Sequence, residues 1–159
     1  MKLHLPDAAA TSALAADLKA VLPDDVSGWT LLLEGELGAG KSTFARALIH
    51  AMGHDGAVPS PTYTLVEPYH LPAATVYHID LYRVSDDEEL RFLGWTDLED
   101  GFRLVEWPER VPGLSGTADL LLHLDYVDHG RQASLRALST RAEGLVSRLS
   151  EPADTQLQD

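Results

Sequence analysis

Residues 35–42 read Gly-Glu-Leu-Gly-Ala-Gly-Lys-Ser and match the phosphate-binding pattern G-x-x-x-x-G-K-[ST]. The pattern follows an apolar run at residues 30–33, which is typical of a buried strand, and precedes a helical segment at residues 42–52 that Gly53 ends. A strand, a glycine-rich loop and a helix in this order are the context that supports the pattern. The feature therefore predicts a P-loop nucleotide-binding protein.

Three side chains of the loop have a predicted role at the phosphates. Lys41 is expected to neutralise the β- and γ-phosphates, Ser42 to coordinate Mg²⁺ through its hydroxyl, and Thr43 to hydrogen-bond near the α-phosphate. The glycines allow backbone N–H groups to point at phosphate oxygens, and the helix N-terminus adds its positive end. We therefore expect ATP or ADP with Mg²⁺ as ligands, since no N-K-x-D run that favours guanine occurs.

Two further apolar runs, at residues 75–80 and 102–106, read as buried strands, and each ends on an acid. A P-loop enzyme needs an acid on the far side of the Mg²⁺, at the end of a neighbouring strand. Asp80 and Glu106 both satisfy this requirement. One is expected to hold a metal-bound water, and the other to ligate Mg²⁺ or orient the attacking water; the alternative is that both are ordinary polar residues at strand ends.

The segment at residues 60–65 reads Ser-Pro-Thr-Tyr-Thr-Leu and places two hydroxyls after a turn fixed by proline. In GTPases a switch-loop threonine senses the γ-phosphate. Thr62 or Thr64 is a candidate for the same role here. The alternative interpretation is an edge strand of β-branched residues with a turn before it.

The remaining patterns alternate strands with helices. A helix is expected at residues 8–22 after Asp7, a short helix from a capping box at residues 85–88, strands at 119–126 and 132–138 joined by a hairpin turn, and a helix at 141–149. This order predicts an α/β fold, a P-loop NTPase-like three-layer sandwich whose mostly parallel central sheet has antiparallel C-terminal strands.

Length and composition limit the other possibilities. With 159 residues, we expect one domain at residues 1–150 and a loose polar tail at 151–159. The chain has no cysteine, so any metal must be held by oxygen or imidazole. No run is long and apolar enough to span a bilayer, and no signal peptide is recognisable, so we expect no membrane contact and a cytoplasmic location. The net charge of −13 disfavours direct binding of nucleic acid.

Five segments, taken together, resemble the bacterial TsaE family, the P-loop ATPases of the tRNA threonylcarbamoyladenosine (t6A) pathway. They read G-E-L-G-A-G-K-S-T at residues 35–43, S-P-T-Y-T-L-V-E at 60–67, Y-H-I-D-L-Y-R at 77–83, E-E-L at 88–90 and V-E-W-P at 105–108. They occur in order and span much of the chain. The P-loop alone is shared by many families, whereas the other segments make the combination very specific.

The resemblance implies a slow, Mg²⁺-dependent ATPase that works with the proteins TsaD and TsaB, which transfer the threonylcarbamoyl group to the adenosine following the anticodon. The tRNA is then held through the complex, in keeping with the acidic composition. Carried over by position, Ser42 and Glu106 ligate Mg²⁺, Asp80 assists hydrolysis, and Trp107 belongs to the E-W pair. The positions implied to contact the nucleotide are Thr11, Leu37, Gly38, Ala39, Gly40, Lys41, Ser42, Thr43 and Arg131.

Two other classes of function share these motifs. A small-molecule kinase of P-loop type uses an Arg-rich lid to exclude water, and no such lid is recognisable in the sequence. A nucleotide-gated switch with negligible turnover needs the same threonine loop and the same acids, Asp80 and Glu106, as a weak hydrolase does. The sequence therefore leaves the ATPase and the switch open.

Overall fold

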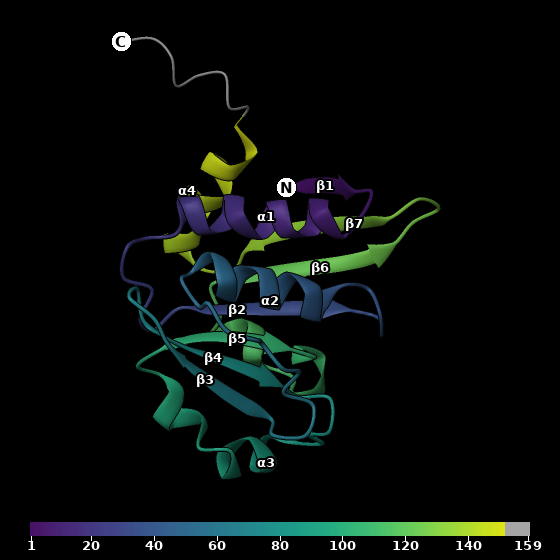
Figure 1. Cartoon of the computed structure of the whole chain (residues 1–159). Helices are drawn as coiled ribbons and strands as arrows, with labels where there is room; N and C mark the ends of the chain where they lie inside the picture. Colours follow the sequence, from purple (N-terminus) through teal and green to yellow (C-terminus); the bar gives the residue numbers. More distant parts are fainter. Residues whose placement is uncertain (152–159) are drawn as a thin grey trace.

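The structure is a computed structural model that describes residues 1–151 (Figure 1). The expected tail at 151–159 lies outside the described residues from residue 152 onward. The strands are β1 (Lys2–Leu5), β2 (Thr30–Gly35), β3 (Val66–His70), β4 (Thr75–Asp80), β5 (Phe102–Glu106), β6 (Leu120–Tyr126) and β7 (Arg131–Ala137). The α-helices are α1 (Ala8–Val21), α2 (Lys41–Ala51), α3 (Asp87–Phe92) and α4 (Thr140–Ser150), and the 3₁₀ turns are η1 (Trp95–Leu98), η2 (Pro108–Arg110) and η3 (Leu114–Gly116).

The strands form one sheet in the order β1-β7-β6-β2-β5-β4-β3. β2 pairs in parallel with β5 and β6, and β4 pairs in parallel with β5. Antiparallel pairs lie toward both edges, between β6 and β7, β7 and β1, and β4 and β3. The expected parallel centre with antiparallel C-terminal strands is therefore confirmed, and the strand that precedes the P-loop lies in the middle of the sheet.

Alternation along the central strands sends side chains to two hydrophobic clusters. On β2, Leu31 and Leu33 join a cluster with α1, α2 and α4, whereas Leu32 joins a cluster with α3, η1 and η3. Leu104 and Val105 on β5 divide between the same two clusters. Both faces of the sheet are thus covered, which confirms the three-layer α/β arrangement (Figure 1).

Helices α1 and α2 pack against each other on one face of the sheet. Asp7 caps α1 as expected, because its Oδ1 accepts a hydrogen bond from the Ala10 N–H at 2.8 Å. Leu14 and Leu18 of α1 are buried, as is Phe44 of α2. This packing places the N-terminal ends of the two helices along one cleft.

The structure adds two strands that the sequence did not predict, β1 and β3, which form the two edges of the sheet. Each is short, and its burial pattern shows little alternation, so neither segment carries the period-two signal of a strand. The cap of α3 was also assigned to the wrong residue. Asp86 rather than Ser85 caps the helix, because its Oδ1 accepts from the Glu89 N–H at 2.9 Å. The Ser85 hydroxyl instead donates to the Glu89 carboxylate.

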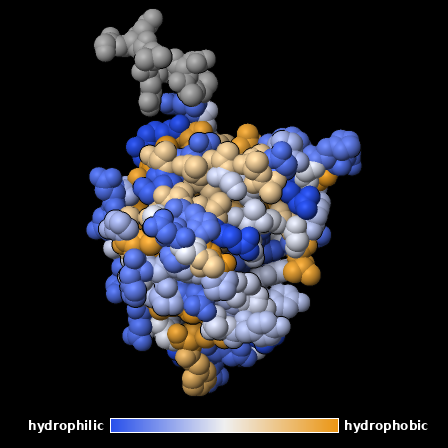
Figure 2. All heavy atoms as spheres, viewed as in Figure 1, coloured by the Kyte–Doolittle hydropathy of each residue, from blue (hydrophilic) through white to orange (hydrophobic). Residues whose placement is uncertain are grey.

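The surface is mixed in polarity. Hydrophilic residues cover much of the face seen in Figure 2, and hydrophobic groups are interspersed among them. Large exposed hydrophobic side chains include Leu37 at the tip of the P-loop, Tyr63 and Phe92. Within residues 1–151, no helix combines the length and apolar character that crossing a bilayer requires.

Candidate nucleotide-binding site

The loop between β2 and α2 has the backbone shape of a phosphate cradle. Gly40 precedes α2 with a left-handed φ of 109°, and no side chain caps this helix. The N–H groups of the first turn therefore remain available to a ligand. Glycine is required at Gly35 as well, because a Cβ there would lie 2.6 Å from the carbonyl oxygen of Leu124.

The Lys41 ammonium lies inside the curl of the loop. It donates to the carbonyl oxygens of Gly35 and Glu36, the latter at 2.9 Å. The Trp107 ring covers it, with its centroid 4.0 Å from Nζ. Burial lowers the pKa of Lys41, although nearby carboxylates favour its charged form, and Glu106 has the largest effect among them. The loop thus holds a buried cation at the point where phosphate charge would have to be neutralised.

Glu106 connects the P-loop helix with strand β4. It ends β5 and is 2% exposed. Its Oε1 accepts a hydrogen bond from the Ser42 hydroxyl at 2.9 Å, and its Oε2 lies 2.6 Å from His78 Nε2. The parallel register of β4 and β5 sets Asp80 directly beside Glu106. A hydroxyl and two carboxylates therefore meet at the carboxyl ends of the parallel strands.

Asp80 connects the segment at residues 60–65, which carries Thr62, to the side chains of Ser42 and Glu106. The Thr62 hydroxyl donates to its Oδ2 at 3.3 Å, and the Tyr82 N–H donates to its Oδ1 at 2.8 Å. Burial raises the pKa of Asp80, and the negative charge of the neighbouring Glu106 raises it further. The hydrogen bond from the Tyr82 N–H lowers it in part. Thr64 is exposed and does not line the cleft at this site. Of the two candidate threonines, the structure brings only Thr62 to the acids.

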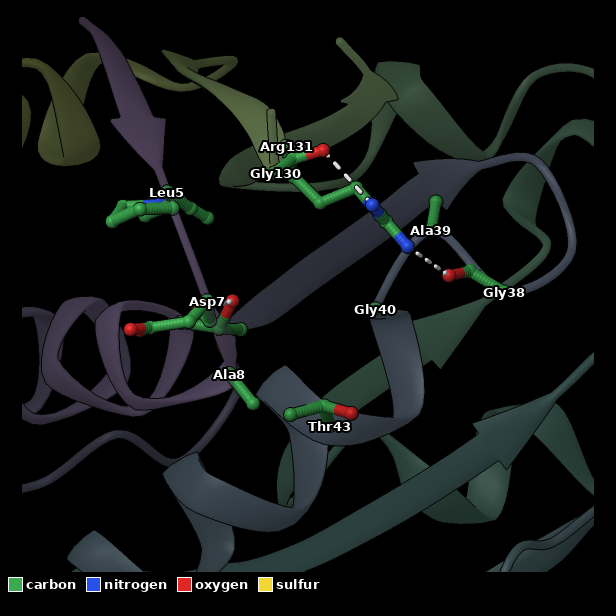
Figure 3. A pocket seen from close by; sticks show the side chains of 11 residues that line it. Leu5, Asp7, Ala8, Gly38, Ala39, Gly40, Thr43, Gly130 and Arg131 are labelled. Carbon is green, nitrogen blue, oxygen red and sulfur yellow. Dashed lines mark hydrogen bonds between the residues drawn. The ribbon is translucent and has the colours of Figure 1, made fainter. Parts of the chain in front are cut away.

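The P-loop separates two clefts. The first, about 310 Å³, contains the side chains of the predicted phosphate and metal site. The second, about 210 Å³, lies between the N-terminal ends of α1 and α2 and the β6–β7 turn (Figure 3). The first is lined by Leu37, Gly38, Gly40, Lys41, Ser42, Thr43, Thr62, Asp80, Tyr82, Glu106 and Trp107. The second shares Gly38, Gly40 and Thr43 and adds Ala39, Thr11 and Arg131 among others.

The two clefts together include every residue that the sequence predicted for the site except Thr64. Thr11 belongs to the first turn of α1, is buried and lines the second cleft, and Arg131 reaches across the same cleft to the P-loop. Its Nη2 donates to the Gly38 carbonyl at 3.3 Å, as the dashed line in Figure 3 shows. Tyr126 stacks under that guanidinium and donates to the Leu37 carbonyl at 2.7 Å. The β6–β7 hairpin thus holds the outer part of the P-loop.

Two residues of the site were missed by the sequence reasoning. His78 contacts Glu106, and Tyr82 lies against Trp107 with ring centroids 5.0 Å apart. A signal for His78 was present, since it precedes Asp80 by two residues on the same strand and so shares its face. Tyr82 follows the strand in a turn, where no periodicity indicates its direction.

Similar proteins are known for most of the chain. The family model for threonylcarbamoyl adenosine biosynthesis protein TsaE matches residues 5–134. The tRNA threonylcarbamoyladenosine biosynthesis protein TsaE of Haemophilus influenzae is 43% identical over 120 residues, which cover 74% of this chain and 76% of that protein. The TsaE protein of Synechocystis is 37% identical over 119 residues, covering 72% and 74%. A crystal structure of Bacillus subtilis YdiB superposes with a TM-score of 0.75 at 27% identity, covering 94% and 93% of the two chains.

The central parallel sheet, the glycine-rich loop after its middle strand and the flanking helices define an α/β protein with a P-loop NTPase-like fold. The match over residues 5–134 then narrows this class to one family. The chain belongs to the TsaE family.

Proposed function

We propose that this protein binds ATP with Mg²⁺, hydrolyses it slowly, and acts with TsaD and TsaB in forming the threonylcarbamoyl group on the adenosine that follows the anticodon of tRNA. Family membership supports the pathway. The observation that carries the ATPase is the contact of Glu106 with Ser42, at 2.9 Å, beside Asp80. It joins the acid of a neighbouring strand to the hydroxyl that follows the P-loop lysine.

The chain holds the nucleotide from both sides of the P-loop. In the first cleft, Lys41 and the N–H groups at the start of α2 bind the phosphates, and Thr43, which lines both clefts, lies toward the second. In the second cleft, Thr11 and Arg131 contact the rest of the nucleotide. Lys41 leaves the loop carbonyls for the phosphate oxygens, since phosphate offers its ammonium a full opposite charge.

The donors at the site suit Mg²⁺. This ion prefers oxygen ligands, and one or two carboxylates together with phosphate oxygens and water complete its coordination. The Ser42 hydroxyl and the Glu106 carboxylate lie in contact and would hold the ion between them. When bound, Mg²⁺ would neutralise part of the negative charge of the phosphates.

Asp80 orients the attacking water and Thr62 responds to the γ-phosphate. Asp80 faces the cleft beside Glu106, and its raised pKa makes it a better proton acceptor than an ordinary aspartate. The Thr62 hydroxyl reaches Asp80 from a loop and bonds to Ser60 Oγ at 2.7 Å, so a shift of this loop changes the surroundings of the water. Trp107 and Tyr82 limit the access of solvent at the mouth of the cleft.

The tRNA is held by the partners rather than by this chain, because 25 acids against 12 lysines and arginines repel the phosphate backbone. The cytoplasm is the compartment that we propose, since the partners and the tRNA act there.

The test is ATP hydrolysis by this protein alone and with TsaB and TsaD, comparing the wild type with Glu106→Gln. We expect turnover that rises with the partners, requires Mg²⁺, and falls about 100-fold or more in the variant, because a positioned group of this kind contributes that much. Glu143→Gln on α4 is the matched control and should match the wild type. Turnover at background with both partners would favour the nucleotide-gated switch, and phosphate transferred to a metabolite would favour the kinase.

Asp80→Asn is expected to abolish hydrolysis and at the same time to raise the free energy of unfolding by about 1 kcal/mol. A carboxyl whose pKa is higher in the folded than in the unfolded state costs stability above its unfolded pKa, because folding then buries a charge. Asparagine removes that charge and still accepts from the Tyr82 N–H. Urea unfolding at pH 7 measures the effect, with the exposed Asp128→Asn as control; a less stable Asp80→Asn protein contradicts it.

Arg131→Ala is expected to weaken nucleotide binding about fivefold, which is the effect of losing one hydrogen bond of about 1 kcal/mol. The guanidinium supports the Gly38 carbonyl and lines the second cleft. Titration with a fluorescent ATP analogue measures the affinity. Arg136→Ala on the same strand, where the side chain is exposed, is the control. Equal affinities of the two variants would show that Arg131 does not support the site.

A further inference from the structure

His78 is a buried histidine whose hydrogen bonding is only half complete. It lies on β4 and is 1% exposed. Its Nε2 lies 2.6 Å from Glu106 Oε2, and among the described residues no protein atom hydrogen-bonds its Nδ1. A carboxylate can only accept hydrogen bonds, so the hydrogen of this contact is on Nε2. Within the described residues, the hydrogen bond to Glu106 is therefore the only side-chain hydrogen bond that the imidazole makes.

The strand register explains how His78 reaches this carboxylate. On β4, His78 and Asp80 share a face, and Asp80 is the partner of Glu106 on β5. His78 itself pairs with Leu104, one step back along the same face, so its side chain reaches Glu106 diagonally. The two oxygens of Glu106 are thereby divided, one bound by His78 and the other facing Ser42.

The buried His78–Glu106 pair adds little to the free energy of unfolding. A buried polar pair stabilises no more than a well-packed hydrophobic pair, and an unpartnered buried nitrogen costs free energy. The residues around it on the same face, Val76 and Leu104, are fully buried and apolar. A leucine at position 78 would pack well in that environment. The histidine is therefore explained by its contact with Glu106 rather than by packing in the core.

We propose that His78 is a positioning residue: its Nε2–H fixes the Glu106 carboxylate so that Oε1 faces Ser42 and the Mg²⁺ position. The inference rests on the proposed function, in which Glu106 and Ser42 hold the ion. Residues that hydrogen-bond a metal ligand from behind orient it, and their loss costs about 10- to 100-fold in metal affinity. His78 does not touch the nucleotide cleft itself.

The test measures the Mg²⁺ concentration that half-saturates binding of a fluorescent, non-hydrolysable ATP analogue. His78→Gln keeps an N–H donor that reaches Glu106, whereas His78→Asn has the same amide on a shorter side chain. We expect the asparagine variant to need about 10- to 100-fold more Mg²⁺, and the glutamine variant to stay within about threefold of the wild type. Binding in EDTA should be equal in all three, since the P-loop contacts are unchanged.

Val76→Ala controls for a general loss of packing, because Val76 is buried on the same strand and face but away from Glu106. It should unfold at a lower temperature and keep the Mg²⁺ dependence of the wild type. Equal Mg²⁺ requirements in His78→Asn, His78→Gln and the wild type would overturn the inference. If wild-type binding does not depend on Mg²⁺ at all, the proposed function fails instead.

Discussion

Replacing Lys41 with alanine is expected to weaken ATP binding by about 100-fold or more and to bring hydrolysis to background. Each charge-assisted hydrogen bond to a phosphate contributes about 1.5–3 kcal/mol, and two such bonds correspond to at least two orders of magnitude. The structure adds a second reason. Lys41 is surrounded by the carboxylates of Glu106, Glu109 and Asp80, so its removal leaves a negative cleft that repels the phosphates.

Titration with a fluorescent ATP analogue and a phosphate-release assay check this prediction. Lys19→Ala is the matched control, because Lys19 lies in the last turn of α1 and the chain has only three lysines. Thermal unfolding establishes that the Lys41→Ala protein is folded. If the folded variant has an affinity for ATP within about threefold of the wild type, the P-loop does not bind the phosphates as proposed.

Asp119→Ala is expected to lower the free energy of unfolding by about 3 kcal/mol. Asp119 precedes β6 and is 4% exposed. Its Oδ2 accepts from the Thr30 N–H at 3.0 Å, and its Oδ1 accepts from Ser139 Oγ and Arg141 Nε, both at 2.7 Å. Alanine leaves the Thr30 N–H buried without a partner and detaches the start of α4 from the sheet. Urea unfolding followed by circular dichroism measures the loss.

The loss should also depend on pH. Burial favours the neutral form of Asp119, but hydrogen bonds from Arg141, Ser139 and the Thr30 N–H outweigh it and lower its pKa. An acid whose pKa is lower in the folded state stabilises the fold above its unfolded pKa of about 3.9, and this stabilisation disappears as the pH falls through the folded pKa. The difference between wild type and variant should therefore be largest near neutral pH and shrink below about pH 4.

Asp125→Ala on β6 is the control for Asp119→Ala, since its side chain is 58% exposed. It should change the free energy of unfolding by less than about 0.5 kcal/mol. A loss in Asp119→Ala below about 1 kcal/mol, or one that is the same at pH 7 and pH 3.5, would show that the carboxylate does not hold the fold together in this way.

The two ends of the parallel strands have different polar chemistry. At the N-terminal end, the carboxylate of Asp119 is fully bonded, and Arg103 Nε donates to the Thr30 hydroxyl at 3.0 Å. At the carboxyl end, burial lowers the pKa of Lys41 and raises that of Asp80, and His78 Nδ1 has no partner within the described residues. Asp119 stabilises the sheet, whereas Lys41, Asp80 and His78 lie at the end of the sheet where ligands of such sheets bind.

Local sequence patterns predicted much of the fold. The strands expected at 75–80 and 102–106 have these bounds in the structure, because each is an apolar run limited by turn residues and a terminal acid. The P-loop was also predicted correctly as a strand–loop–helix unit, since its glycines and lysine act within one continuous segment. The edge strand β1 was not predicted, because it pairs with β7, which is distant in the sequence. The edge strand β3 was missed although it pairs with the next strand, β4, because Pro68 interrupts its short run.

The amino-acid sequence alone was enough to predict a P-loop with Lys41 and Ser42 and two buried strands that end on acids. The contacts of Thr62, rather than Thr64, with Asp80 and of His78 with Glu106 became evident only from the folded chain. The same holds for Arg131, which crosses to the P-loop from 93 positions away. A sequence motif describes the geometry of one continuous segment. These contacts instead depend on strand register and on the packing of separate elements, which no local pattern specifies.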